Sequence, residues 1–271
     1  MSAMDDFLWY SYFGITREEI RADNEEDKEK AQNACIQRAY LDLCRTLKYS
    51  RSVDGLKEKE KNGEKEYAKQ YRDSKKAFLE KEKNCIRLKI KALFKNGKDF
   101  DGWHKCTCGK LIDIAKDSST KNNELLFGEG FSYGQAQKWL NMTLKYMWLM
   151  GFWNNDEEMN EKIIDALHVP VDDYILEAAL DSEILNPPIK AREGLRSVCW
   201  SRWNYEGKKC EDEKCEDKKN KCTDSYKGNY IKFQRYIQEN KGENKNRIEW
   251  EQKAWIKIAK NRKAKEEKRG L

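Results

Sequence analysis

The chain has 271 residues, of which 38% are charged and 38% are hydrophobic, and its formal net charge is +6. A generally disordered chain is excluded, because 9 Trp, 13 Tyr and 9 Phe are far more aromatic residues than a protein without a core carries. The sequence contains no apolar run of about 18 residues, so we expect no transmembrane helix.

The cysteines and the first residues predict a cytoplasmic protein. The residues around Asp5 and Asp6 lack the basic region and the long apolar core of a signal peptide. The 9 Cys are an odd number in a long chain, which is not typical of a disulfide scaffold. We therefore expect reduced thiols and a cytoplasmic location.

The composition predicts an all-α fold, because Lys, Glu, Leu and Ala are abundant and only 3 Pro interrupt the chain. Apolar residues at close to helical spacing predict a first helix over 24–49. The stretch 51–76 is mostly charged, which is typical of a solvated helical arm or a mobile insertion. An apolar face returns over 77–95 and is expected to end at Asn96-Gly97, and a short helix follows over 100–116.

The second half of the chain begins with a tight glycine-rich connection over 128–134, followed by a long apolar helix over 134–150. The remaining pattern predicts short helices and one charged loop. The expected helices cover 157–167, 173–180, 190–203, 226–240 and 247–266, and the loop covers 204–225.

One polar stripe crosses the apolar helix over 134–150. Gly134, Lys138, Asn141 and Lys145 are spaced 4, 3 and 4 residues apart, so they share one face. Lys138 is expected in the first turn of this helix, where burial and the positive end of the helix dipole both disfavour an ammonium. A neutral amine is the form that a lysine nucleophile needs. Alternatively, Lys138 reaches solvent with its amine or binds a phosphate.

A carboxylate begins the next informative segment. Asp172 follows Val169-Pro170-Val171 and precedes a short predicted helix. An aspartate in this position is typical of a helix N-cap, which by itself is sufficient reason for it.

These two elements together resemble the helix-hairpin-helix DNA glycosylases, and the spacing from lysine to aspartate is most similar to the archaeal 8-oxoguanine glycosylase branch. The resemblance is carried by Gly134-Gln-Ala-Gln-Lys138 and Val169-Pro-Val-Asp172, within residues 125–180. The chain departs from the family at the hairpin, where residues 130–134 read Gly-Phe-Ser-Tyr-Gly. The resemblance implies a single helical domain over 1–271, made of two helical lobes with a cleft between them.

The resemblance also implies the chemistry. Lys138 would attack C1′ of a flipped nucleotide and form a Schiff base, and Asp172 would stabilise the positive charge that develops on the sugar. Such an enzyme excises a modified base and can also cleave the strand as a lyase. Its role would be base-excision repair or defence against viral DNA that carries modified bases.

The resemblance further implies double-stranded DNA as the partner of a monomeric protein. Backbone N–H groups of the hairpin would hold a phosphate at Ser132, Tyr133, Gly134 and Gln135. Base-pocket candidates are Gln137, Trp139, His168, Trp103 and Trp200, with His104 beside Trp103. For the tryptophans, core packing is the alternative.

Charge and cysteine spacing complete the expectations. Residues 241–271 hold eleven Lys or Arg against five Glu, a net charge of +6 that equals that of the whole chain. This segment is therefore either a DNA-binding edge or a solvated helix. Cys199, Cys210, Cys215 and Cys222 lack the spacing of a zinc site or of the family's iron–sulfur cluster, so we expect no metal, with a monovalent cation at the hairpin left open.

Two other functions remain open at this stage. One is a non-catalytic helical nucleic-acid-binding protein in which Lys138 contacts a phosphate. The other is an all-α interaction protein with a charged surface.

Overall fold

The computed structural model describes residues 3–16, 19, 24–93, 99–119, 125–127, 130–154, 156–189, 199–206 and 229–269. The chain divides into two compact units, Met1–Phe152 and Trp153–Leu271. The described residues contain helices and a few isolated β-bridges but no strand, which confirms the all-α prediction. None of the described helices combines the length and the apolar character that crossing a membrane requires.

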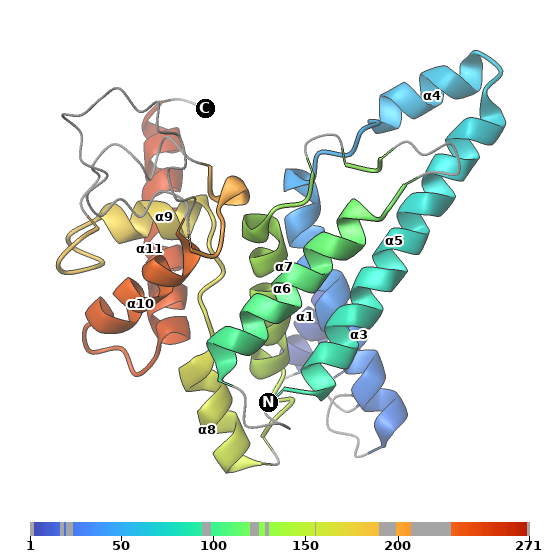
Figure 1. Ribbon diagram of the computed structural model, residues 1–271. Coiled ribbons are helices and arrows are strands. Elements are labelled where there is room, and N and C mark those ends of the chain that lie inside the picture. The colour runs from blue at the N-terminus through green and yellow to red at the C-terminus, as the bar shows by residue number, and fades with distance from the viewer. Residues whose placement is uncertain are drawn as a thin grey trace, which may run out of the picture. The chain divides into compact units, whose positions relative to one another are not determined.

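Unit 1 is built around the contact between two helices (Figure 1). α3 (Glu25–Leu43) packs along α7 (Tyr133–Leu149). Ala31, Cys35 and Ala39 of α3 have small, fully buried side chains, which let helices approach closely. The indole N–H of Trp139 donates to the carbonyl oxygen of Ile36 at 3.0 Å, which fixes the register of the pair. The other helices in the described part of unit 1 are α1 (Ala3–Phe13), α4 (Val53–Lys61), α5 (Lys65–Lys91) and α6 (Phe100–Lys116), and a 3-10 turn covers Cys44–Thr46.

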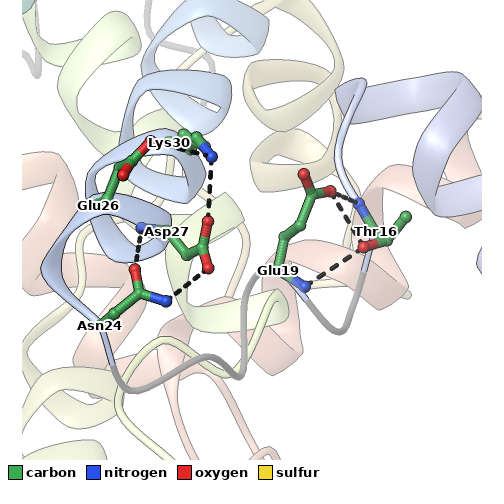
Figure 2. A network of polar contacts seen from close by, with 6 residues as sticks. All are labelled: Thr16, Glu19, Asn24, Glu26, Asp27 and Lys30. Atoms are coloured by element: carbon green, nitrogen blue, oxygen red, sulfur yellow. Dashed lines mark hydrogen bonds and ion pairs between the residues drawn. The ribbon is translucent and has the colours of Figure 1, made fainter.

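The start of α3 is held by side-chain caps (Figure 2). Asn24 accepts a hydrogen bond from the backbone N–H of Asp27 at 2.8 Å and donates its amide N–H to the Asp27 carboxylate at 2.7 Å. Lys30 pairs with Asp27 at 3.2 Å, close to the first turn. Upstream, the backbone N–H of Thr16 donates to the Glu19 carboxylate at 2.6 Å, and the N–H of Glu19 donates to the Thr16 hydroxyl at 3.3 Å. The Asn24 cap satisfies an N–H group that the start of α3 otherwise leaves without a partner.

The charged stretch 51–76 is helical in the structure. It contains α4 and the first part of α5, which runs without a break from Lys65 to Lys91 because no Pro or Gly interrupts it. Most of its charged side chains are exposed, as expected for a solvated helix. The side chains of Ala68 and Tyr71 between them are buried, and the Tyr71 hydroxyl donates to the carbonyl oxygen of Leu126 at 3.2 Å.

Other predicted elements agree with the structure in different degrees. The helix over 100–116 has the same bounds as α6. The helix expected to end at Asn96-Gly97 ends at Lys91, and residues 94–98 lie outside the described residues. Most of the predicted helix over 190–203 and of the loop over 204–225 also lies outside them, apart from a 3-10 turn over Trp200–Arg202.

The described part of unit 2 contains the helices α8 (Glu157–Ala166), α9 (Asp173–Leu180), α10 (Tyr230–Asn240) and α11 (Arg247–Lys268). α9 packs against α11, where the ring of Tyr174 stacks on Trp255 at a centroid distance of 5.0 Å. Arg262 places its guanidinium 4.1 Å from the centre of the Tyr174 ring and pairs with Glu177 at 2.6 Å. The extended segment between α8 and α9 is buried from Leu167 to Val171.

One acidic side chain is buried without a partner in unit 1. Glu82 lies on the inward face of α5 and has no solvent exposure, and neither carboxyl oxygen has a hydrogen-bond partner. Burial raises the pKa of Glu82 to about 9, so the side chain is neutral at physiological pH. Burial also raises the pKa values of Cys85 and Cys108, and Glu82 adds to both shifts, so the two thiols lie near this carboxyl group.

The ionisation of Glu82 makes a testable contribution to stability. The folded protein keeps this proton up to about pH 9, whereas the unfolded chain loses it near the ordinary value of 4.5. Stability is therefore greatest below that ordinary pKa and falls as the pH rises towards 9, by at most about 1.4 kcal/mol per pH unit. We expect Glu82→Gln to remove this dependence on pH. The free energy of unfolding of Glu82→Gln, measured by urea denaturation, should therefore rise relative to that of the wild type from pH 5 to pH 8.

The exposed Glu80 of the same helix provides the matched control. Glu80→Gln is expected to keep the wild-type dependence on pH. Parallel pH profiles for the wild type and Glu82→Gln would show that Glu82 is not held in its neutral form.

Candidate functional site

α7 begins at a well-defined capping box. Ser132 is the N-cap, its hydroxyl accepts from the backbone N–H of Gln135 at 3.1 Å, and the Gln135 side chain accepts from the backbone N–H of Ser132 at 3.0 Å. Gly130 precedes the cap with φ 78, a left-handed conformation that favours glycine. The amide of Gln135 also donates to the carbonyl oxygen of Thr46 at 2.9 Å, which anchors the turn to the end of α3.

The structure describes only parts of the connection before α7. α6 ends at Lys116, and the described residues directly before the turn, 125–127, form isolated bridges rather than a helix. Leu125 bridges to Ser119, and Phe127 bridges to Tyr49. Residues 128 and 129 of the predicted connection lie outside the described residues. The hairpin geometry implied by the resemblance therefore stays a prediction.

Lys138 lies in the buried part of α7, with 9% of its surface exposed. The helix begins at Tyr133, so Lys138 is its sixth residue and belongs to the second turn rather than the first. Gly134 and Asn141 of the same stripe are buried, and Lys145 is half-buried.

The polar side chains next to Lys138 form a closed chain of hydrogen bonds. The carbonyl oxygen of Asn141 can only accept, so Nε2 of His104 donates to it at 2.8 Å. The Asn141 amide donates to Gln137 at 3.0 Å, and the Gln137 amide donates to the backbone oxygen of Gly134 at 2.9 Å. At the other end, Nδ1 of His104 lies 2.9 Å from the Tyr133 hydroxyl, which donates to it when the imidazole is neutral. The first and last groups of this hydrogen-bonded chain, the Tyr133 hydroxyl and the Gly134 carbonyl oxygen, belong to neighbouring residues of α7.

This chain binds α6 to α7, because His104 belongs to α6 and the other members belong to α7. All four side chains are buried, and His104 is completely inaccessible to solvent. Each hydrogen bond replaces water that the buried groups have lost, so the chain fixes the rotamers around Lys138. Gln137, a base-pocket candidate, is committed to this internal chain.

The predicted phosphate-binding residues already use part of their hydrogen-bonding capacity. The N–H groups of Ser132 and Gln135 both donate within the capping box. Tyr133 and Gly134 are buried at the same helix start. A phosphate bound to Ser132 or Gln135 through these N–H groups would have to replace the capping hydrogen bonds.

The tryptophan candidates of unit 1 are parts of its core. Trp139 is fully buried and contacts α3 through the hydrogen bond to Ile36. Trp103 is 6% exposed, and its indole N–H donates to the carbonyl oxygen of Lys89 on α5 at 3.1 Å. Both side chains have the packing role that was the alternative to base recognition.

Asp172 is the N-cap of α9 in unit 2. One carboxylate oxygen accepts from the backbone N–H groups of Tyr174 and Ile175, each at 3.1 Å. Pro170 favours an extended conformation at Val169, and the segment up to Asp172 is extended. The predicted N-cap is therefore confirmed, and the carboxylate has a defined orientation at the helix start.

The other candidates of unit 2 are also buried. Nδ1 of His168 lies 2.9 Å from the Tyr230 hydroxyl, and the side chain is 1% exposed. Trp200 is 3% exposed in its 3-10 turn. The structure thus groups Lys138 and Gln137 in unit 1 and groups Asp172 and His168 in unit 2.

A second amine of unit 1 has an unusual environment. Lys75 on α5 is half-buried and holds its Nζ 3.9 Å from the centre of the Tyr49 ring. Burial lowers the pKa of Lys75, which makes its amine a competing nucleophile and a necessary control for any lysine chemistry of this protein.

The basic C-terminal segment forms most of α11. Its later turns are exposed, and Lys260, Lys263, Lys265 and Lys268 make no ion pair with any residue that the structure describes. Trp250 and Ile258 in the earlier turns are buried, so the helix packs through its first part and exposes lysines in its last part.

Two buried polar residues, Glu82 and Gln234, were not among the residues predicted from the sequence. Glu82 is spaced four residues from both Phe78 and Ile86, so its place on an apolar stripe was visible in the sequence. Gln234 contacts Val169 from a distance of 65 residues along the chain, and no local pattern indicates this contact.

Metal ligands are not grouped in the part of the chain that the structure describes, where no cluster of three or more His, Cys, Asp or Glu could hold an ion. Cys199 is exposed, and Cys210, Cys215 and Cys222 of the predicted cluster lie outside the described residues.

The chain matches no protein-family model, no curated protein and no solved structure. The resemblance to the helix-hairpin-helix glycosylases accordingly rests on the motifs around Lys138 and Asp172.

The cap at Asp172 can be separated from any chemical role by substitution. Asp172→Ala removes the acceptor for two N–H groups and is expected to destabilise the protein by about 0.5–2 kcal/mol. Asp172→Asn keeps an acceptor of the same shape and should stay close to wild-type stability. Urea denaturation measures both.

The neighbouring Asp173 is exposed and serves as the control, since Asp173→Ala should change stability by no more than about 0.5 kcal/mol. Equal losses for Asp172→Ala and Asp173→Ala would contradict the cap.

Proposed function

We propose that this protein is a DNA glycosylase that removes a modified base through a covalent lysine intermediate and can act as a lyase on the resulting abasic site. The observation that carries the proposal is the environment of Lys138. Its side chain lies on a buried helix, beside a closed chain of hydrogen bonds that holds the neighbouring rotamers in place. A covalent nucleophile has to be held in a fixed orientation towards the atom that it attacks, and this rigid environment supports that role for Lys138.

The proposed reaction uses two side chains. The Lys138 amine attacks C1′ of the deoxyribose, the bond to the base breaks, and the base leaves with the bonding electrons. Opening of the sugar ring then gives a Schiff base between Nζ of Lys138 and C1′. The Asp172 carboxylate stabilises the positive charge on the sugar, and its hydrogen bonds to Tyr174 and Ile175 keep it oriented for this task.

The exposed lysines in the later turns of α11 support DNA as the substrate. Four of them, Lys260, Lys263, Lys265 and Lys268, make no ion pair with the described residues and can neutralise phosphates and release counterions. The same lysines would also serve a protein that binds nucleic acid without catalysis. A covalent adduct distinguishes the two functions.

Borohydride trapping tests the proposal directly. Duplexes that carry 8-oxoguanine or an abasic site are incubated with protein and borohydride, which reduces a Schiff base to a stable amine. The abasic duplex is informative whichever base the enzyme excises. We expect an adduct with the wild type, no adduct with Lys138→Gln, and a trapping rate about 10²-fold lower with Asp172→Asn.

Lys75→Gln is the matched control, because Lys75 is a half-buried lysine of the same unit and burial lowers its pKa. It should form the adduct as the wild type does. The same adduct from Lys138→Gln would contradict the proposal. Salt-dependent DNA binding by a wild type that forms no adduct would favour the non-catalytic function.

A further inference from the structure

The segment that presents Asp172 is held by a side chain from a distant helix. Gln234 on α10 is fully buried, and its amide pairs with the backbone of Val169 in both directions. The Gln234 carbonyl oxygen accepts from the N–H of Val169 at 2.9 Å, and the Gln234 amide donates to the carbonyl oxygen of Val169 at 2.9 Å. A single side chain thus replaces the backbone partner that an extended segment finds in a β-ladder.

This pairing restrains the segment from both sides of one peptide unit, through the N–H and the carbonyl oxygen of Val169. Val169 is three residues before Asp172, and the intervening Pro170 and Val171 are buried and extended. Pro170 has no N–H and a fixed φ, so the segment transmits the position of Val169 with little freedom. His168 adds a contact of 2.9 Å to Tyr230, which is on the same helix as Gln234.

We propose that Gln234 is a positioning residue, which sets the place of the Asp172 carboxylate by fixing the backbone of Val169. The inference rests on the proposed function of Asp172. Gln234 itself touches neither substrate nor reacting atoms in this account. A carboxylate that stabilises a developing charge is sensitive to displacement, because an error of about 1 Å can reduce a rate by roughly 10²-fold.

The first test measures the rate of the trapping reaction with excess protein over an abasic duplex, together with DNA affinity. Gln234→Met fills a similar volume but cannot pair with Val169. We expect a trapping rate at least about 10-fold lower than that of the wild type, with DNA affinity unchanged within about twofold. Gln234→Glu at pH 6 can accept from the N–H and donate as a protonated acid, so it should recover most of the rate.

Tyr236→Phe is the matched control from the same helix. Tyr236 is two residues along α10 from Gln234 and therefore on a different face of the helix, and it donates its hydroxyl to the carbonyl oxygen of Pro187 at 3.0 Å. It should keep the wild-type trapping rate. A folded Gln234→Met with the wild-type rate would overturn the inference, and so would a Gln234→Glu that is as slow as Gln234→Met.

A second measurement does not depend on activity. Amide hydrogen exchange by NMR reports on the N–H groups of Val169, Tyr174 and Ile175 relative to Ile258 in α11. We expect slow exchange at all of them in the wild type and selectively faster exchange at the first three in Gln234→Met. Fast exchange of Val169 in the wild type would overturn the inference even if Gln234→Met does not fold.

The two measurements also separate this inference from the proposed function. Absence of an adduct from the wild type removes the glycosylase proposal, and the exchange data then show whether Gln234 still holds the Asp172 segment. An active wild type with an unaffected Gln234→Met removes the positioning role alone.

Discussion

A helix that is buried on nearly all sides must satisfy its polar side chains within the core, and α7 carries this requirement for unit 1. Asn141 and Gln137 cannot reach water, so they bond to each other, to His104 of α6 and to the backbone of α7 itself. On its other side α7 uses small residues of α3 and the indole of Trp139. The position of Lys138 follows from these two contacts, since both faces of its helix are fixed.

Glu82 shows the opposite situation in the same unit. Its carboxyl group is as inaccessible as His104 but has no partner, and burial keeps it protonated. Such a group destabilises the fold at neutral pH, whereas the hydrogen bonds of His104, Asn141 and Gln137 stabilise it. In unit 2 the polar groups are again paired, because Gln234 satisfies the backbone of Val169 and Asp172 satisfies the start of α9. The buried polar groups around the proposed catalytic residues are therefore mostly well bonded.

The sequence predicted elements that depend on local signals. The bounds of α6, the N-cap at Asp172 and the buried helix around Lys138 follow from caps and from apolar periodicity within one segment. It was less informative where charge concealed burial, as at Ala68 and Tyr71, or where a contact spans many residues, as between Gln234 and Val169. It also placed Lys138 one turn too early, because Ser132 rather than a later residue caps α7. The pairing of Lys138 with Asp172 remains a proposal, since the two residues belong to different units.

The proposed mechanism depends most on which amine attacks C1′. Mass spectrometry of a digest of the borohydride-trapped protein identifies that amine, because the reduced deoxyribose remnant adds a fixed mass to one lysine. We expect this added mass on Lys138. The same mass on Lys75, or its spread over the exposed lysines of α11, would contradict it.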